Sequence, residues 1–497
     1  MASSKTAETI RQKGGGVNAS FRDPLGRLLL FEDRALRLVT SKGAGELKSF
    51  LGTSVARDFT ASGRLVRTNV LDPASDSDLF KRPEITDLLD SDGEQILVEH
   101  ERIAVRSFPY EWPPEMLYAA GTLTLDLAEA ALAENYLLKD ATPYNVLFVG
   151  WRPVFVDLLS FEQRNSYDPT WLPLNQFVQT ILLPLLVNKH YGLRLDQLLT
   201  VNRDGLEPSQ VARLPGLLRK LSPIFLSLVS VPHWLNKKQP LNDESIYRPK
   251  RLSNANRAHF ILQQQLKRLR RQLAKVEPRA GGTSDWSDYM TPDKFFSLEY
   301  LQAKERFVER ALNETSPRRV LDVGCNTGYF SRLAARKDAS VVAIDQDPGV
   351  VGTVWRSAAA EALDILPLVV NLARPTPAFG WRNEECPSFL DRSRARFDSV
   401  LMLAVLHHLL VTEQIPLSAI LELAAELTSE HLIIEFVAPG DPMFRHLVRG
   451  RAELFTGLTK ESFEAAAGRW FELVRVENIN QTRSLYLLHK RSGHGDA

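Results

Sequence analysis

The chain has 497 residues, of which 44% are hydrophobic and 24% are charged, and its formal net charge is +1. The length suffices for two or three domains, and the near-neutral charge excludes a global field favouring nucleic acid or acidic partners. Two cysteines, Cys325 and Cys386, are too few for a disulfide framework or a cysteine-based zinc site and fit a reducing compartment.

The N-terminal end carries no secretory pattern. Residues 1–18 are polar and contain a run of three glycines, so we expect a flexible tail and a cytoplasmic protein. The most apolar run, residues 177–187, is too short to span a bilayer and contains Pro184. We therefore expect no membrane partner.

Residues 19–245 are predicted to form an α+β domain. Short alternating segments typical of strands lie at 27–31, 35–39, 64–67 and 95–98, with a further candidate at 103–105. A wide apolar face predicts a helix over 114–136, and proline-punctuated apolar segments predict several helices over 160–245. The expected domain thus has a β-rich first lobe and a helical second lobe.

Between the two lobes the chain resembles the catalytic-loop region of the protein-kinase-like fold. Asp140, Asn145 and Asp157 match its spacing of base and metal ligands, which would converge on Mg²⁺ and a phosphate. Leu138-Lys139 and Asp157-Leu-Leu depart from the usual His-Arg and Asp-Phe-Gly, and no glycine-rich phosphate loop is evident. The resemblance therefore implies a degenerate module. A simpler interpretation is that Asp140 and Asn145 cap a turn.

Residues 246–295 are predicted to be a helical linker and cofactor lid. Leucines at helical spacing over 254–276 alternate with lysines and arginines, so this helix either contacts RNA or is an amphipathic linker with a solvated basic face. We favour the linker. Trp286, Tyr289 and Tyr300 are the lid candidates.

The most informative stretch is the buried strand and glycine turn at 319–331. Val320, Leu321 and Val323 predict a strand of a parallel sheet, and Asp322 lies at its carboxyl end, where open α/β sheets bind ligands. Asp322-x-Gly324-x-x-x-Gly328 resembles the first motif of class I S-adenosylmethionine (SAM)-dependent methyltransferases. An acid at this position suits the cationic amino end of SAM and would repel a pyrophosphate.

The resemblance covers residues 296–497 and implies a Rossmann-like, doubly wound α/β sheet. Strands are expected at 340–345, 366–370, 397–403 and 431–437, followed by an antiparallel pair at 471–477 and 484–489. Asp345 would bind both ribose hydroxyls, and Asn371 would accept a bond from the adenine amino group. The full set of cofactor-binding residues that the resemblance implies is Asp322, Gly324, Cys325, Asn326, Gly328, Asp345, Gln346, Asn371, Leu372 and Leu403.

Two further features concern the methyl acceptor. Either His407 or His408, which follow the fourth strand, could be a general base, or one of them merely packs against SAM. The insertion at 373–396, with Trp381, Arg382, Asn383 and Glu384, is a candidate substrate lid. No metal is required.

The sequence thus predicts a SAM-dependent methyltransferase acting on a small-molecule or modified-RNA acceptor, with the N-terminal domain selecting the substrate. One alternative is a SAM-binding scaffold that recruits a partner through a pseudokinase-like N-terminal domain, and another is a bifunctional kinase–methyltransferase. The sequence determines neither the acceptor nor the oligomeric state.

Overall fold

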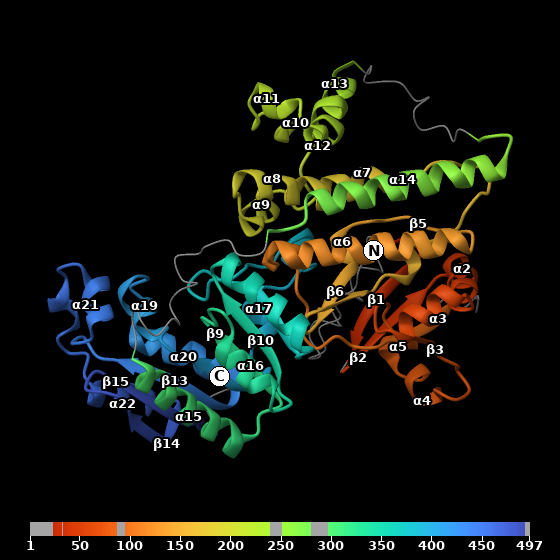
Figure 1. Cartoon of the computed structure of the whole chain (residues 1–497). Helices are drawn as coiled ribbons and strands as arrows, with labels where there is room; N and C mark the ends of the chain where they lie inside the picture. The colour runs from red at the N-terminus through yellow and green to blue at the C-terminus, as the bar shows by residue number, and fades with distance from the viewer. Residues whose placement is uncertain (1–22, 32, 87–94, 239–250, 280–296, 493–497) are drawn as a thin grey trace.

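The computed structural model describes residues 23–31, 33–86, 95–238, 251–279 and 297–492 (Figure 1). The expected tail at 1–18 and two of the three lid candidates, Trp286 and Tyr289, lie outside these residues.

A seven-stranded sheet organises the C-terminal half, with the strand order β11-β10-β9-β12-β13-β15-β14. The first five strands in this order are parallel, and β15 runs antiparallel to both β13 and β14. The strands are β9 (Arg319–Val323), β10 (Ser340–Asp345), β11 (Ile365–Val369), β12 (Phe397–Met402), β13 (Thr428–Val437), β14 (Phe471–Asn478) and β15 (Arg483–Lys490). The predicted doubly wound sheet with a closing antiparallel pair is confirmed.

Helices cover both faces of this sheet because its strands are apolar on both sides. Val320 and Val341 pack on one face and Leu321 and Val342 on the other, in two separate clusters. The helices of this half are α15 (Leu298–Thr315), α16 (Tyr329–Ala335), α17 (Pro348–Glu361), α18 (Phe389–Ser393), α19 (Leu406–Val411), α20 (Leu417–Leu427), α21 (Pro442–Val448) and α22 (Lys460–Ala467). Short 3₁₀ turns occupy η7 (Trp381–Asn383) and η8 (Ala452–Phe455).

The first lobe of the N-terminal half is built on a four-stranded antiparallel sheet of order β1-β2-β4-β3. Its strands are β1 (Gly26–Phe31), β2 (Arg34–Val39), β3 (Thr68–Val70) and β4 (Ile96–His100), and its helices are α2 (Ser41–Leu51), α3 (Ser54–Ala61), α4 (Ser77–Phe80) and α5 (Pro83–Thr86). The strands expected at 64–67 and 103–105 are wrong, and the helices over 41–61 were not predicted. Their apolar residues Leu47, Phe50 and Val55 face the core at helical rather than alternating spacing.

The segment that resembles a kinase catalytic loop forms two short antiparallel pairs. Strand β5 (Tyr136–Leu138) pairs with β8 (Phe161–Gln163), and β6 (Val146–Val149) pairs with β7 (Arg152–Phe155). The turns η2 (Pro143–Asn145) and η3 (Leu158–Ser160) connect them. The kinase-like fold of this half stays an expectation.

Helix α6 (Pro114–Ala133) is the central helix of this half, preceded by the 3₁₀ turn η1 (Pro109–Glu111). By length and composition it is the one helix of the described residues that could cross a membrane, but 61% of its most apolar window is buried inside the protein. It lies against α14 (Ala255–Lys275), whose Leu262, Leu266, Leu269 and Leu273 are all buried. Burial on several sides accounts for the apolar composition of α6.

The remaining helices lie on the side of α6 that faces away from the four-stranded sheet (Figure 1). They are α7 (Leu174–Phe177), the π-helix η4 (Val178–Leu182), α8 (Leu183–Tyr191), α9 (Leu195–Val201), α10 (Pro208–Val211), α11 (Leu217–Lys220), α12 (Pro223–Phe225), the π-helix η5 (Leu226–Ser230) and α13 (Val231–Lys238). The predicted helical character of residues 160–245 is thus confirmed from residue 174 to residue 238, whereas residues 161–163 form strand β8.

The two halves are joined through buried contacts. Arg392 of α18 forms a buried ion pair with Glu111 and donates to the Arg106 carbonyl. Arg356 of α17 pairs with Glu115 of α6, and Trp355 Nε1 donates to the Trp151 carbonyl at 3.1 Å. These ion pairs and hydrogen bonds hold the two halves in one orientation.

We therefore expect Arg392→Ala to destabilise the protein by about 3–5 kcal/mol, because Glu111 would remain buried without its partner. The matched control is Arg394→Ala, whose exposed pair with Glu426 contributes less than about 1 kcal/mol. Urea unfolding of both variants measures the difference. Equal effects would contradict the structural role of the buried pair.

Candidate functional site

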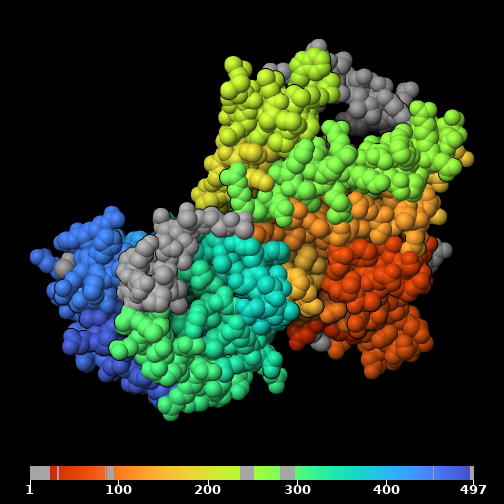
Figure 2. All heavy atoms as spheres, viewed as in Figure 1, coloured from red at the N-terminus to blue at the C-terminus, as the bar shows by residue number. Residues whose placement is uncertain are grey.

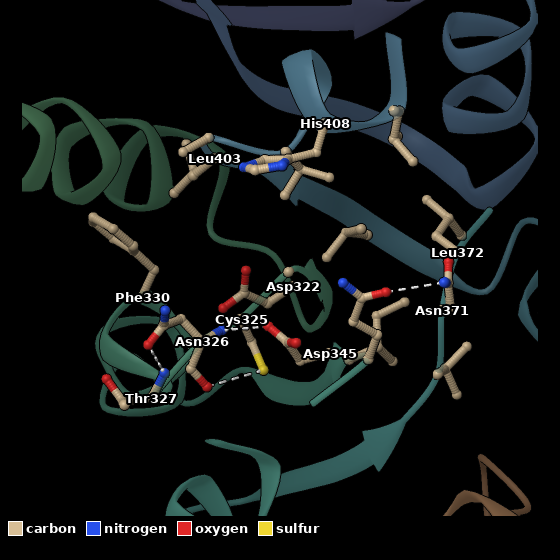
Figure 3. Close-up of a pocket in the computed structure, with 18 of the residues that line it drawn as sticks. Asp322, Cys325, Asn326, Thr327, Phe330, Asp345, Asn371, Leu372, Leu403 and His408 are labelled. Atoms are coloured by element: carbon tan, nitrogen blue, oxygen red, sulfur yellow. Dashed lines mark hydrogen bonds between the residues drawn. The ribbon is translucent and has the colours of Figure 1, made fainter. Parts of the chain in front are cut away.

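A cavity of ≈ 300 Å³ opens where the parallel strands β9, β10 and β12 end (Figure 3). We call it the strand-end cavity. Its lining residues are Lys304, Asp322, Val323, Gly324, Cys325, Asn326, Thr327, Tyr329, Phe330, Ile344, Asp345, Gln346, Val370, Asn371, Leu372, Leu403, Ala404, Val405, His408, Leu409, Thr412, Glu413 and Leu447. Ten of the twelve predicted site residues are therefore brought together, and Gly328 and His407 are not.

Asp322 is the buried acid at the centre of the cavity. It is only 3% exposed, and its Oδ2 accepts a hydrogen bond from the Ser331 hydroxyl at 2.6 Å. Burial raises the pKa of Asp322 to about 7, against the lowering effects of Ser331 and the Lys304 ammonium. A carboxylate in this environment is stabilised by a cation that enters the cavity.

The turn after β9 depends on left-handed backbone conformations. Gly324 has φ +68, and a Cβ there would lie 2.4 Å from Val405 Cγ2. Gly328 has φ +76, caps α16, and would place a Cβ 2.9 Å from Val354. Gly328 thus allows close packing of α16 against α17, and its predicted contact with the cofactor stays a prediction.

Asp345 lies at the end of β10, across from this turn. Its Oδ2 accepts a bond from the Asn326 backbone N–H and its Oδ1 accepts one from the Asp347 N–H, both at 3.0 Å. Each carboxylate oxygen keeps a further acceptor position, so two ribose hydroxyls can still bind. Burial raises the pKa of Asp345, and the two backbone donors partly oppose this rise.

The third wall of the cavity comes from the loops after β10 and β11. The Asn371 side-chain amide donates to Gln346 Oε1 at 3.0 Å, and Asn371 Oδ1 accepts a bond from Ala373 N–H. Leu372 lies beside Asn371 and supplies apolar surface, whereas Leu403, which follows β12, lies on another side of the cavity (Figure 3). An amide pair beside an apolar side chain is suited to a planar heterocycle such as adenine.

Only one of the two candidate histidines reaches the cavity. His408 lines it, and burial together with the Arg483 charge lowers the pKa of His408. His407 is fully buried outside the cavity lining, and burial lowers its pKa to about 3. The predicted alternative of His407 as the base therefore loses its geometric support, because helix α19 turns that side chain into the core.

Lys304 lines the cavity and was missed by sequence reasoning. It lies on α15 and pairs with the fully buried Glu435 of β13 at 2.7 Å. Although burial alone would raise the pKa of Glu435, Lys304 and Arg483 hold it at about 2. A signal was present, since Lys304 lies four residues after Tyr300 and four before Val308, on the apolar face of α15.

Tyr300 belongs to this same buried cluster rather than to a lid. Its hydroxyl donates to Glu435 Oε1 at 2.5 Å and lies 3.0 Å from Arg483 Nη1. Arg483 also binds Asp441 through two hydrogen bonds. The cluster ties α15, β13 and β15 together behind the cavity.

The insertion at 373–396 docks on the N-terminal half and contributes no residue to the cavity lining. Phe379 packs edge-on against Tyr110 at 5.1 Å, and Arg203 donates to Cys386 Sγ at 3.3 Å. Trp381 is 65% exposed and does not line the cavity. The predicted lid is therefore a joint between the two halves.

Asn145 and Asp157, two of the three kinase-like residues of the N-terminal half, lie in one hydrogen-bonded group. Arg37 of β2 donates to Asp157 Oδ1 at 2.7 Å, and the Ser160 hydroxyl donates to Asp157 Oδ2 at 2.6 Å. The Asn145 amide donates to Ser160 Oγ at 3.1 Å. Both oxygens of Asp157 are thus engaged within the protein, and the described residues contain no cluster of three or more His, Cys, Asp or Glu suited to a metal ion.

The strand-end cavity fits SAM by the chemistry of its donors and acceptors. The buried Asp322 carboxyl suits the cationic amino end, Asp345 suits the ribose, and Asn371 with Leu372 suits the adenine. Bound SAM supplies an electrophilic methyl group, and His408 is the titratable group of α19 that lines the same cavity.

Comparisons with known proteins agree with this geometry. A family described as a methyltransferase domain matches residues 297–486. Nodulation protein NoeA of Rhizobium meliloti (strain 1021) is 28% identical over 507 residues, covering 99% of each chain. The likeness to that protein thus extends over the N-terminal half as well.

Three solved structures are also similar to parts of the chain. The PH0226 protein from Pyrococcus horikoshii OT3 is 16% identical over 42% of this chain and 100% of its own, with a TM-score of 0.31. N-methyltransferase NodS from Bradyrhizobium japonicum WM9, in complex with S-adenosyl-L-homocysteine, is 14% identical over 42% of this chain and 93% of its own, with a TM-score of 0.30. Magnesium protoporphyrin IX methyltransferase from Synechocystis PCC 6803 is 20% identical over 39% of this chain and 84% of its own, with a TM-score of 0.28.

The affinity for SAM should depend on the protonation of Asp322. A protonated carboxyl cannot balance a cationic ligand, so affinity is full above the pKa of about 7 and falls about tenfold per pH unit below it. The Asp322→Asn variant should bind SAM weakly, and its SAM affinity should not change between pH 5 and 7. Calorimetric titration at several pH values measures both, and a wild-type affinity independent of pH would contradict the assignment.

Proposed function

Because residues 297–486 form a class I SAM-dependent methyltransferase domain, we propose that this enzyme methylates a small-molecule acceptor bound at the His408 end of the strand-end cavity. In this proposal Asp322, Asp345 and Asn371 orient SAM, and His408 accepts the proton of the acceptor. The N-terminal half contributes to acceptor selection.

The charge of the cavity lining is the observation that carries the choice of acceptor. Among its residues within the described part of the chain, three are acidic (Asp322, Asp345 and Glu413) and only Lys304 is a lysine or arginine. The Lys304 charge is already balanced by Glu435. A site that binds RNA needs several basic groups along the phosphate backbone, and this lining lacks them.

The basic helix α14 does not supply the missing charges. Its leucines are buried against the N-terminal core, and Arg270 is held by Asp126 at 2.6 Å and by Glu129 at 2.9 Å. Helix α14 packs on α6 and contributes no residue to the strand-end cavity. The arrangement therefore supports the linker interpretation over an RNA-contacting role.

His408 has the properties that a general base needs in this reaction. Its lowered pKa keeps the imidazole neutral at pH 7, so a ring nitrogen can take a proton. The acceptor heteroatom forms a bond to the methyl carbon as the carbon–sulfur bond breaks, and the acceptor's proton passes to His408. The rest of the rate enhancement comes from alignment of the two reactants within the cavity.

Contacts between the halves support a role for the N-terminal half near the cofactor. Arg194, which precedes α9, donates to the backbone carbonyl of Gln346 at 2.6 Å while it also binds Asp196. Gln346 lines the cavity. The likeness to Nodulation protein NoeA over both halves supports the proposal that the two act as one unit.

The acceptor class is tested with SAM that carries a tritiated methyl group. Full-length protein is incubated with two fractions of an extract from its source cells: the low-molecular-weight filtrate and total RNA. We expect label to enter the filtrate in the presence of wild-type protein and not with Asp322→Asn. Transfer to RNA alone would contradict the small-molecule assignment.

His408→Gln should lower kcat by about 10²–10⁴-fold while it leaves SAM affinity within about twofold, since only proton transfer is lost. With the wild-type enzyme at saturating SAM, kcat should fall on the acid side only below pH 6.5, because the pKa of His408 is lowered. A His408→Gln enzyme with wild-type kcat would remove the base from the proposal.

A further inference from the structure

The helices α10 to α13 form a lobe that stands away from the rest of the molecule (Figures 1 and 2). Eight of the 21 exposed large apolar side chains in the described part of the chain lie between residues 214 and 235 of this lobe. They are Leu214, Leu217, Leu218, Leu221, Leu226, Val231, Trp234 and Leu235. Such a concentration on one protrusion marks an interaction surface rather than scattered exposure.

The exposed side chains are not needed for the core of the lobe. Phe225, Leu228 and Val229 already seat the α12–η5–α13 helix in the main hydrophobic cluster. Leu226, Val231 and Trp234 of the same helix face outward. A helix that is apolar on its outer as well as its inner face requires a second apolar environment.

The leucines of α11 and of its C-cap, Leu221, are the most exposed of the set. Leu217, Leu218 and Leu221 are 83%, 89% and 71% exposed, respectively. Arg219, between them in sequence, bends back to the body of the protein, where it donates to the His190 carbonyl and lies over the Tyr191 ring. The three leucine side chains are therefore exposed to solvent, while the Arg219 side chain is held against the body of the protein.

The sequence of the lobe contains basic residues and no acidic ones. Between Glu207 and Asp243 there is no acidic residue, although one residue in four of the whole chain is charged. The same stretch contains five basic residues: Arg213, Arg219, Lys220, Lys237 and Lys238. This local excess stands out because the net charge of the entire protein is only +1.

We propose that the α10–α13 lobe docks on the surface of a membrane that contains anionic lipid. Exposed leucines and a tryptophan would enter the boundary between headgroups and acyl chains, while Arg213 and Lys220 meet the lipid phosphates. The apolar helix Pro223–Leu235 is too short to span a bilayer, so the lobe lies on the membrane rather than across it. This surface departs from the expectation that the protein has no membrane partner.

Sedimentation of the full-length protein with lipid vesicles tests the proposal. One set of vesicles is phosphatidylcholine alone and the other contains roughly one third phosphatidylglycerol. We expect binding to the anionic vesicles only, and weaker binding as sodium chloride rises from about 0.1 M to about 0.5 M. Equal binding to both sets, or binding to neither, would overturn the proposal.

Two variants separate the apolar and basic contributions. Leu217→Ser, Leu218→Ser and Leu221→Ser together should lower partitioning onto anionic vesicles by at least about tenfold. Arg213→Ser with Lys220→Ser should lower the preference for anionic over neutral vesicles by about 25-fold, since each charge near the surface contributes about fivefold. Both variants should keep wild-type SAM affinity and thermal stability, because none of the substituted side chains lines the cavity and the leucines are exposed.

A matched control makes the same change at exposed leucines of the C-terminal half. Leu298→Ser, Leu454→Ser and Leu473→Ser together should partition like the wild type. If the control loses as much binding as the lobe variant, the lobe is not the docking surface. A wild-type dimer that becomes a monomer in the lobe variant, with no vesicle binding by either, would identify a contact between copies and overturn the membrane assignment.

Discussion

A carboxyl group buried at the end of the central strand constrains the C-terminal half. Asp322 is 3% exposed and has Asp345 as a like-charged neighbour, so its ionised form is costly without a cation. The nearby ammonium of Lys304 is committed to Glu435 at 2.7 Å. The Asp322 carboxylate thus lacks a full counter-charge within the protein, and a cationic ligand such as the amino end of SAM supplies one.

The second constraint is the permanent joint between the halves. The pair Arg392–Glu111 is almost fully buried, and the main hydrophobic cluster runs from the N-terminal helices into the methyltransferase sheet. The insertion after β11 provides much of this joint through Phe379, Cys386 and Arg392. The N-terminal half therefore acts as a fixed extension of the catalytic domain rather than as a tethered partner.

The sequence was sufficient for the sheet and for most of the cavity, because both follow from local patterns. Strands of a parallel sheet are continuous apolar runs, and their carboxyl ends meet at one edge, which brought Asp322, Asp345 and Asn371 together. The predictions that were wrong or left open depended on tertiary contacts. Whether His407 or His408 faces the cavity depends on where α19 begins, and the destination of the insertion depends on partners about 280 residues away in sequence.

The N-terminal half was less predictable for the same reason. Apolar residues at 44–56 fit short strands as well as helices by composition, and only their packing against the core distinguishes the two. Arg37 was not singled out, because nothing in the sequence links a residue of β2 to Asp157, 120 positions later. Contacts of this range are set by the fold and leave no local periodicity.

A crystal structure of the full-length protein with S-adenosyl-L-homocysteine tests whether Asp322 organises the site. The ligand should occupy the strand-end cavity with its amino group within hydrogen-bonding distance of Asp322 and its ribose hydroxyls on Asp345. A ligand bound elsewhere, or with its amino group turned away from Asp322, would contradict the claim that the buried carboxyl organises the site.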